Sequence, residues 1–315
     1  MSAISHGLNI ETLADNSLTI TEVMAFSKKA RCFVPEDRLR NCQKSYDQLS
    51  KIALQTSRSC YGLHTSYGHN VKDKRDPKEF KFWQRDLLQY LQVGLGPGLP
   101  PPVVRLALRL QLFKASRGAS GIHPKTVERL TDLGNAEALP NVPRYGSLGA
   151  SGDLIPMAHA VSPLFREEIP GPRDVIGLVN TNAMMGAWAI TQFESINHIC
   201  QRICEITAIN SLTLSCPAEH FSGVGFSINP RLEKNMQAAK IISDYRESWR
   251  KALGLSHQTA LTQAKYSLRC SPQIVGNCLD FLSFAHDKIL AEALSVSDNP
   301  IIVDGEDEAW HGGLF

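Results

Sequence analysis

The sequence lacks the signatures of a secreted, membrane-spanning or metal-binding protein. Its eight cysteines include no Cys-x-x-Cys pair and are too sparse for a disulfide framework. The N-terminus has no charged stretch followed by an apolar core, as a signal peptide would, and no apolar run is long enough to span a bilayer. We therefore expect a soluble protein in the reducing cytoplasm, with no metal site and no membrane partner.

An excess of charge of one sign is also absent. The 33 basic and 31 acidic residues leave a formal net charge of +2. No basic patch with interleaved aromatic residues occurs, and the mixed-sign segment 72–76 is typical of a solvated loop. Nucleic acid is therefore not expected as a partner. No internal repeat is visible, and 315 residues suffice for one large domain or two.

Helical patterns dominate what the sequence does contain. The apolar segment that begins at Pro101 and Pro102 meets Gly118 at its end, which is the usual asymmetry of proline at a helix start and glycine after its stop. Further helices are predicted over residues 38–56, 82–92, 124–133, 182–214, 232–253 and 272–294.

Strand signals are short and scattered, such as that of residues 301–303. The glycine-rich residues 94–98 are typical of a turn, because they follow a helix and not the strand that a phosphate loop requires. We predict a mainly α fold, with an N-terminal region over residues 1–197 and a bundle of long helices over residues 198–315.

The segment Gly146-Ser147-Leu148-Gly149-Ala150-Ser151-Gly152-Asp153 contains a tripeptide that can form an electrophile. The amide nitrogen of Gly152 can attack the carbonyl carbon of Ala150 and close a five-membered ring with loss of water. Loss of a second water from Ser151 leaves an exocyclic methylene, and the product is a methylidene-imidazolone. The flanking glycines allow the sharp backbone conformation that ring closure requires.

A purely structural interpretation competes with this one. Ser151 or Asp153 is also a suitable N-cap for a helix formed by the apolar residues that follow. The tripeptide is not distinctive by itself, because Ala119-Ser120-Gly121 repeats it at the end of a predicted helix, where it is typical of a C-terminal turn. The discriminating signal is the longer context of residues 146–156.

That context resembles the histidine and aromatic amino acid ammonia-lyase family, which includes 2,3-aminomutases. Five further motifs in family order extend the resemblance from about Ser17 to Phe315. They are Tyr61–Gly68, Leu178–Asn180, Gln263–Gln273, Ser297–Pro300 and His311–Gly313.

The resemblance implies a helical architecture of the ammonia-lyase and fumarase type. It also implies a methylidene-imidazolone formed autocatalytically from Ala150, Ser151 and Gly152, with no metal or nucleotide. Members eliminate ammonia from a small amino acid substrate, and their active sites are assembled from several subunits of a homotetramer. The reaction is demanding because the β proton is not acidic and the amine is a poor leaving group.

The site residues that the resemblance implies are spread along the chain. Tyr61 matches the tyrosine that removes the β proton, a role that needs positive charge or hydrogen bonds near its hydroxyl. Arg269 matches the clamp of the substrate carboxylate, and Tyr266 would share its helical face. Asn180 and Gln263 match residues that hydrogen-bond the substrate. Structural alternatives compete with these roles. They are an aromatic residue at the edge of a turn for Tyr61, an ion pair for Arg269, and a polar residue on a helix face for Asn180 and for Gln263.

The pair Tyr90-Leu91 aligns with the family residues that face the substrate side chain. Ser-His is typical of histidine specificity, His-Leu of tyrosine and Phe-Leu of phenylalanine. Leu91 cannot hydrogen-bond an imidazole, and the Tyr90 hydroxyl could reach a ring substituent, so we expect an aromatic substrate such as phenylalanine or tyrosine. The alternative is that both residues belong to the core. Asp298 and Asn299 fit a supporting turn before Pro300.

Three departures from the family pattern bear on activity. His64 and Ser66 replace Asn and Gly in the loop of Tyr61, and Ser66 lacks the freedom of glycine at positive φ, which affects the position of Tyr61. Thr181-Asn182 replaces Gly-Thr after Asn180. The chain also stops at Phe315, where the family continues into a long helical region, so we interpret it as a C-terminally truncated member.

The leading hypothesis is an ammonia-lyase that converts an aromatic L-amino acid to an arylacrylate. An aromatic amino acid 2,3-aminomutase would use the same electrophile and re-add ammonia at the β carbon. A hypothesis of another class is a non-catalytic, truncated lyase-like protein that acts as an assembly partner. A serine hydrolase is disfavoured, because residues 149–153 lack the final glycine of a nucleophile elbow.

Overall fold

The structure, a computed structural model, describes residues 7–55, 58–149, 152–229, 231–256, 262–303 and 305–312. Ala150 and Ser151, two of the three residues predicted to form the electrophile, lie outside the described residues. The described residues form a mainly α structure, which confirms the predicted fold class. Among them, no helix combines the length and the apolar character needed to cross a membrane.

The helices and strands are as follows. The helices are α1 (Ile20–Val23), α2 (Glu36–Ala53), α3 (Phe80–Leu91), α4 (Pro101–Ser116), α5 (Pro124–Asn135), α6 (Leu154–Val161), α7 (Asp174–Val179), α8 (Ala183–Thr213), α9 (Val224–Ser227), α10 (Glu233–Ala252), α11 (Tyr266–Arg269) and α12 (Ser271–Leu294). Strands β1 (Leu8–Asn9) and β2 (Cys32–Phe33) pair in parallel, and β3 (Leu95–Gly98) and β4 (Pro143–Tyr145) pair antiparallel.

The long helices predicted from periodicity are all present, with ends shifted by a few residues. Two local predictions were wrong. Residues 95–98 form β3 and not a turn, because the distant segment of β4 supplies a ladder partner. Residues 301–303 form no strand, since their pairing is limited to the single bridge between Ile301 and Trp310.

The chain divides into two compact units, Met1–Thr191 with Ile289–Phe315, and Gln192–Lys288. The predicted division into residues 1–197 and 198–315 differs from these units at the C-terminal end. Residues after Lys288 lie with the first unit, where Arg173 hydrogen-bonds Asp298 and Ala119 accepts a bond from Ile302.

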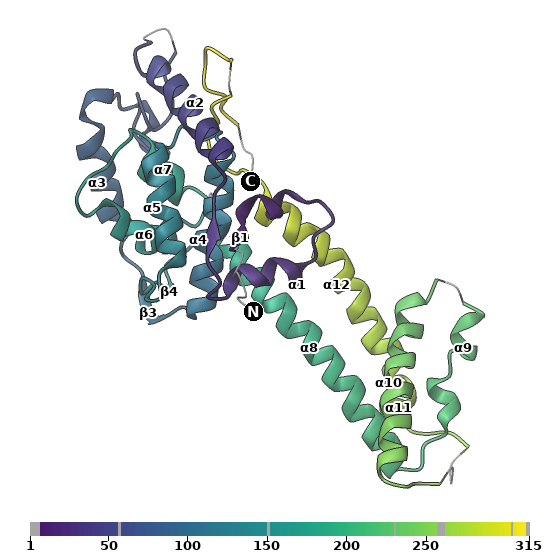
Figure 1. Ribbon diagram of the computed structural model, residues 1–315. Helices are drawn as coiled ribbons and strands as arrows, with labels where there is room; N and C mark the ends of the chain where they lie inside the picture. Colours follow the sequence, from purple (N-terminus) through teal and green to yellow (C-terminus); the bar gives the residue numbers. More distant parts are fainter. Residues whose placement is uncertain are drawn as a thin grey trace, which may run out of the picture. The chain divides into compact units, whose positions relative to one another are not determined.

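Helix α4 forms the core of the first unit, where α2, α5, α6 and α7 contact it (Figure 1). Every residue of α4 from Val103 to Ser116 is buried. Its arginines are compatible with this burial because backbone carbonyls accept hydrogen bonds from their guanidinium N–H groups. Arg105 donates to the carbonyls of Gly134 and Ala136, and Arg109 to those of Phe26, Lys28 and Ala30.

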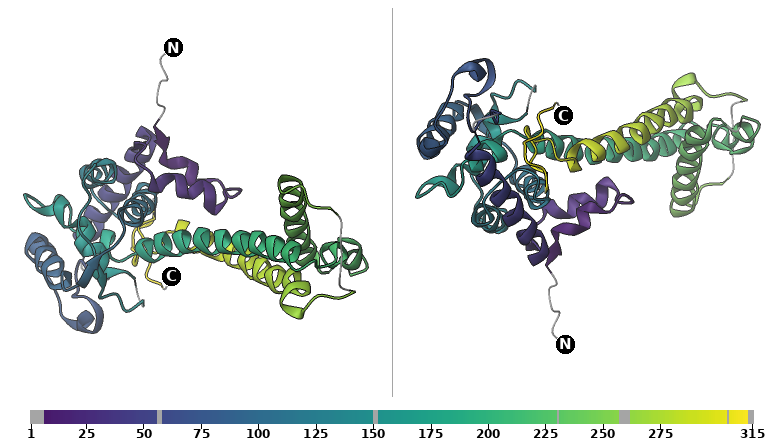
Figure 2. Two further views of the ribbon diagram at one scale, coloured as in Figure 1. Left: turned by 90° about the horizontal axis from the view of Figure 1, so that it is seen from below. Right: turned by 90° about the horizontal axis from the view of Figure 1, so that it is seen from above.

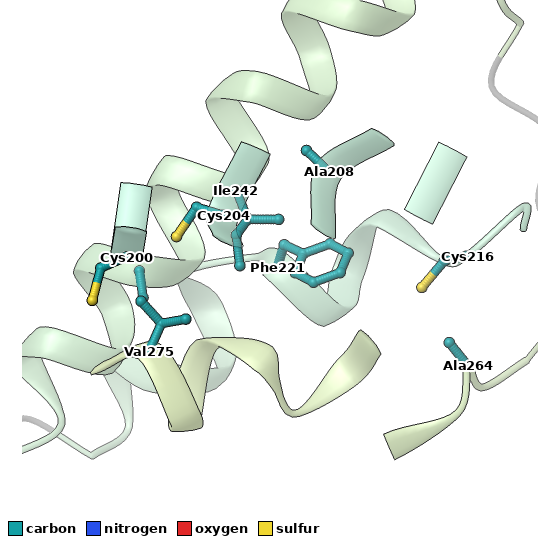
Figure 3. Close-up of a cluster of buried hydrophobic side chains, with 9 residues drawn as sticks. Cys200, Cys204, Ala208, Cys216, Phe221, Ile242, Ala264 and Val275 are labelled. Atoms are coloured by element: carbon teal, nitrogen blue, oxygen red, sulfur yellow. The ribbon is translucent and has the colours of Figure 1, made fainter. Parts of the chain in front are cut away.

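The second unit has its own apolar core. Within this unit α8 and α12 run side by side (Figure 2), and the ring of Phe193 lies 5.8 Å from that of His286. Cys200, Cys204 and Cys216 are buried there in one apolar cluster with Phe221 (Figure 3). Burial raises the pKa of the Cys204 thiol to about 11. Cys200 and Cys204, one helical turn apart on α8, are therefore buried thiols.

Candidate active site

The loop that carries Tyr61 folds back on itself between α2 and α3. Ser66 N–H donates to the Asp73 carbonyl at 2.9 Å, and Arg75 N–H donates to the His64 carbonyl at 2.8 Å. The residues of this loop with positive φ are Gly62 at 72° and Gly68 at 57°. Ser66 is not among the described residues with positive φ, so the strain expected from its replacement of a glycine is not present.

His64, the other departure in this loop, ties its start to the end of α2. Its Nδ1 accepts a hydrogen bond from Cys60 N–H at 3.0 Å, and its Nε2 lies 3.2 Å from the carbonyl of Ala53. Since one ring nitrogen accepts and the other faces an acceptor, these contacts fit the neutral imidazole protonated at Nε2. An asparagine side chain is shorter, so His64 supplies a longer bridge between the two segments.

Tyr61 is held at three points. Its carbonyl accepts a hydrogen bond from Arg173 Nη1 at 3.0 Å, and its N–H donates to His311 Nε2 at 3.1 Å. Its hydroxyl oxygen accepts a hydrogen bond from Gly68 N–H at 2.8 Å. The neighbouring Tyr67 is more deeply enclosed, and burial raises its pKa to about 12. Burial therefore disfavours the ionised form of Tyr67.

Arg173 and Asp298 form a buried ion pair that the sequence did not reveal. Arg173 Nη2 lies 3.1 Å from both carboxylate oxygens of Asp298, and the two residues are 0% and 4% exposed. Burial raises the pKa of Asp298, and the facing carboxylate raises the pKa of Arg173. Because the same guanidinium holds the Tyr61 carbonyl, Asp298 supports the position of Tyr61, in agreement with the supporting role predicted for it. The sequence feature that could have indicated buried charges here is the pair Arg173-Asp174, which stands directly before the apolar residues 175–179.

Gly152, the described residue of the electrophile tripeptide, lies against Asn180. Its φ is 101°, and a Cβ placed on it would lie 3.1 Å from both Asn180 Oδ1 and Thr181 N. Only glycine fits this close approach at this backbone conformation. Asp153 N–H also donates to the Thr181 carbonyl at 2.6 Å, so the chain after the tripeptide is fastened to the residues after α7.

Asp153 stands at the N-cap of α6, as the structural interpretation predicted, but its side chain does not cap that helix. Oδ2 instead accepts a hydrogen bond from Met185 N–H at 2.7 Å, in the first turn of α8. Burial raises the pKa of the carboxyl group. The segment around the tripeptide is therefore joined to two different helices by one aspartate.

The Thr181-Asn182 departure is part of a buried polar network. Asn182 Oδ1 accepts from Lys114 Nζ on α4, and Asn182 Nδ2 donates to Glu292 Oε1 at 2.6 Å on α12. Burial lowers the pKa of Lys114 to about 8. Thr181 Oγ1 accepts from Ala183 N–H at 3.2 Å at the start of α8. The residues beside Gly152 are thus supported from behind by hydrogen bonds to α4 and α12.

A cavity of about 690 Å³ brings several predicted residues together. Tyr61, Tyr90, Leu91 and Asn180 all line it. A neighbouring cavity of about 350 Å³ shares Tyr90 and Leu91 and is lined also by Gly152. Leu91 is buried and Tyr90 is largely exposed, so Leu91 is a wall residue and Tyr90 stands at the rim.

Gln263, Tyr266 and Arg269 belong to the second unit. The short helix α11 confirms that Tyr266 and Arg269 share a helical segment, and the guanidinium carbon lies 4.2 Å from the centre of the Tyr266 ring. Tyr266 and Gln263 are exposed. Arg269 Nε is buried without a hydrogen-bond partner among the described residues, which leaves a donor available.

Solved structures of similar fold place this architecture among ammonia-lyases and aminomutases. The ergothioneine-degrading ergothionase of Treponema denticola matches with a TM-score of 0.83 at 20% identity, over 98% of this chain and 65% of that one. The tyrosine aminomutase of Streptomyces globisporus matches with a TM-score of 0.81 at 23% identity, over the same shares of the two chains.

The sequence profile of the aromatic amino acid lyases matches residues 18–168 and 166–315. The chain belongs to this family, whose members are carbon–nitrogen lyases. A histidine ammonia-lyase of Aliivibrio fischeri is 28% identical over 301 residues, which cover 86% of this chain. The chain spans 57% of the length of that relative.

Proposed function

We propose that this protein is an ammonia-lyase that eliminates ammonia from an aromatic L-amino acid and gives an arylacrylate, through a methylidene-imidazolone that the chain itself forms. The observation that carries the proposal is the packing of Gly152 against Asn180, beside cavities that Tyr61 and Leu91 line. Tyr61 is the proposed base and Leu91 a determinant of the substrate side chain.

The described part of the tripeptide fits a methylidene-imidazolone formed from Ala150, Ser151 and Gly152. Gly152 has the conformation and the close neighbours that leave no room for a side chain, and its successor Asp153 is fastened at both its N–H and its carboxylate. Such restraint favours ring closure because it removes the entropy cost of bringing the reacting atoms together. Once formed, this group would supply the electrophile that makes the amine a leaving group.

The chain's own residues would do the remaining work. The Tyr61 oxygen would take the β proton, and the hydrogen bond that Gly68 N–H donates to it fixes the position of that oxygen. Asn180 would hydrogen-bond the substrate beside Gly152. Arg269, stacked on Tyr266, would clamp a carboxylate with the guanidinium donor that no described residue pairs with, and Gln263 would hydrogen-bond the substrate.

Leu91 supports an aryl substrate over histidine. Its buried side chain offers no hydrogen bond to an imidazole, whereas a phenyl ring loses nothing in contact with it. Histidine is the second candidate substrate, because the relatives at 28% identity are named histidine ammonia-lyases. The two candidates are separated by comparing kcat/KM for phenylalanine, tyrosine and histidine.

We also propose that the active form is a homotetramer. On α8 of the second unit, isoleucines recur at the spacing of three and four residues that marks one helix face, and all of them are exposed. They are Ile196, Ile199, Ile203, Ile206 and Ile209. An exposed apolar stripe of this length is typical of a surface that another subunit covers.

The first experiment is the mass of the purified chain and of its peptide spanning residues 144–166. The proposal expects a deficit of two waters at Ala150-Ser151-Gly152 together with release of arylacrylate from phenylalanine or tyrosine. A peptide of unmodified mass would contradict the catalytic proposal and leave a lyase-like scaffold.

A further inference from the structure

Arg75 holds an unusual position in the cavity of Tyr61. Its guanidinium lies between two aromatic rings, with its central carbon 4.6 Å from the ring centre of Tyr67 and 4.4 Å from that of Trp83. Nη2 donates a hydrogen bond to Ser66 Oγ at 3.0 Å. The stacking and the bond to Ser66 hold the planar guanidinium in one orientation, which lowers the entropy cost of binding a ligand.

Two buried donors on this wall have no hydrogen-bond partner among the residues that the structure describes. They are Nη1 of Arg75 and Nε1 of Trp83, and both side chains line the 690 Å³ cavity. No described carboxylate forms an ion pair with Arg75, although Asp86 lines the same cavity. Buried donors without partners are costly, so two adjacent ones beside a cavity point to an acceptor that comes from outside the chain.

The character of that acceptor follows from the donors. One donor is cationic and the other neutral, and together they match a group with negative charge and two acceptor atoms, which is a carboxylate. The remaining wall is apolar where Leu87, Leu91 and Ile176 contribute to it, which suits a ring or hydrocarbon portion. The cavity volume is also within the range of small-molecule sites.

We infer that Arg75 and Trp83 bind a carboxylate of an aryl carboxylic acid in the Tyr61 cavity. The inference rests on the proposed function in that it names a group on the substrate or product of that site. The carboxylate is either an acid substituent on the aromatic ring, in which case Arg269 keeps the backbone carboxylate, or the backbone carboxylate itself, in which case Arg75 takes the role proposed above for Arg269. Ser66, the departure from glycine, has a role in this arrangement, because its hydroxyl orients Arg75.

The test is isothermal titration calorimetry on the full chain with three probes. trans-Cinnamate carries its carboxylate on the propenyl group, 4-vinylbenzoate carries it on the aromatic ring, and cinnamyl alcohol carries no charge. Arg75→Met removes the cationic donor, and Trp83→Phe removes the indole N–H while keeping an aromatic ring. Arg85→Met is the matched control, since Arg85 is exposed on α3 and is not part of the cavity lining.

Loss of a charge-assisted hydrogen bond predicts that Arg75→Met weakens carboxylate binding roughly 10- to 100-fold, and loss of a neutral one predicts about a five-fold effect of Trp83→Phe. Binding of cinnamyl alcohol should stay within about two-fold in both variants, because the neutral probe gains nothing from a cation. Arg85→Met should leave all three affinities unchanged.

The two carboxylate probes distinguish the sources of the acid. An effect of Arg75→Met confined to cinnamate assigns the backbone carboxylate, and one confined to 4-vinylbenzoate assigns a ring acid. The inference is overturned if Arg75→Met binds both acids as tightly as the unaltered chain does. It is also overturned if Arg75→Met loses as much affinity for cinnamyl alcohol as for the acids, or if the unaltered chain binds neither acid. None of these readouts requires the electrophile, so an unmodified tripeptide mass would count against the proposed function alone.

Discussion

Replacement of Asp298 by asparagine is the sharpest test of how the structure holds Tyr61. The carboxylate lies 3.1 Å from Arg173 Nη2 through both oxygens, and Arg173 is fully buried. Asp298→Asn keeps the shape of the side chain but leaves the guanidinium with neutral acceptors alone, the carbonyls of Tyr61, Ser120 and Pro300 and the oxygen of the introduced amide.

Removal of one partner of a buried ion pair costs about 3–5 kcal/mol, because the remaining charge stays desolvated without its counter-charge. That loss is a large share of the roughly 5–15 kcal/mol by which domains are stable. Urea denaturation followed by tryptophan fluorescence measures it. The control is Glu36→Gln, which makes the corresponding change in the exposed Arg40–Glu36 pair of the same unit. That change should cost less than about 1 kcal/mol.

The same variant should loosen the loop of Tyr61, since Arg173 also binds the Tyr61 carbonyl. Amide hydrogen exchange of Gly68, whose N–H is bound to the Tyr61 hydroxyl, should be faster in Asp298→Asn than in Glu36→Gln. If Asp298→Asn costs no more than Glu36→Gln and leaves the exchange of Gly68 unchanged, the ion pair does not position Tyr61 and the reasoning is wrong.

Three further predictions address the base, the network behind Gly152 and the assembly. Tyr61→Phe should lower arylacrylate formation by roughly 10²- to 10⁴-fold while costing only about 1 kcal/mol of stability, since Gly68 N–H loses one acceptor; undiminished absorbance of the product would exclude Tyr61 as the base. Burial lowers the pKa of Lys114 to about 8, so between that pH and the ordinary lysine pKa the unfolded chain binds more protons than the folded one. The free energy of unfolding of the unaltered chain should therefore rise by up to about 3 kcal/mol relative to Lys114→Met over this pH range, and a difference that does not change with pH would contradict the assignment. Ile203→Glu should shift the molar mass in light scattering toward the monomer, whereas Gln201→Glu, on the same helix, should leave it unchanged; equal masses would show that the isoleucine stripe is not an interface.

Most helices of this protein could be predicted because their signals are local. Proline at the start of α4 and glycine after its end are visible without any knowledge of the fold. The strand β3 could not be predicted in this way. Residues 95–98 have no strand pattern of their own, and they are extended because β4, more than forty residues later, supplies hydrogen bonds.

Much of the candidate site was predictable for a different reason. Tyr61, Asn180 and Gly152 lie in motifs that resemble those of the family and follow one another in the family's order. The structure places the three residues around adjoining cavities. The supports of the site were not predictable. Arg173 and Asp298 are 125 residues apart in sequence, and neither has a neighbouring motif that names the other as its partner.

The sequence by itself determined the helical class, the family and the tripeptide that can cyclise, because helix periodicity and the covalent chemistry of Ala150-Ser151-Gly152 are properties of neighbouring residues. Only the tertiary structure decided which charges are compensated and which donors are left free. Arg173 is neutralised by Asp298, whereas Arg75 and Trp83 each keep a donor beside a cavity that no described residue pairs with. The burial of a side chain and its distance from a partner cannot be read from a sequence, because they are set only when remote segments pack together.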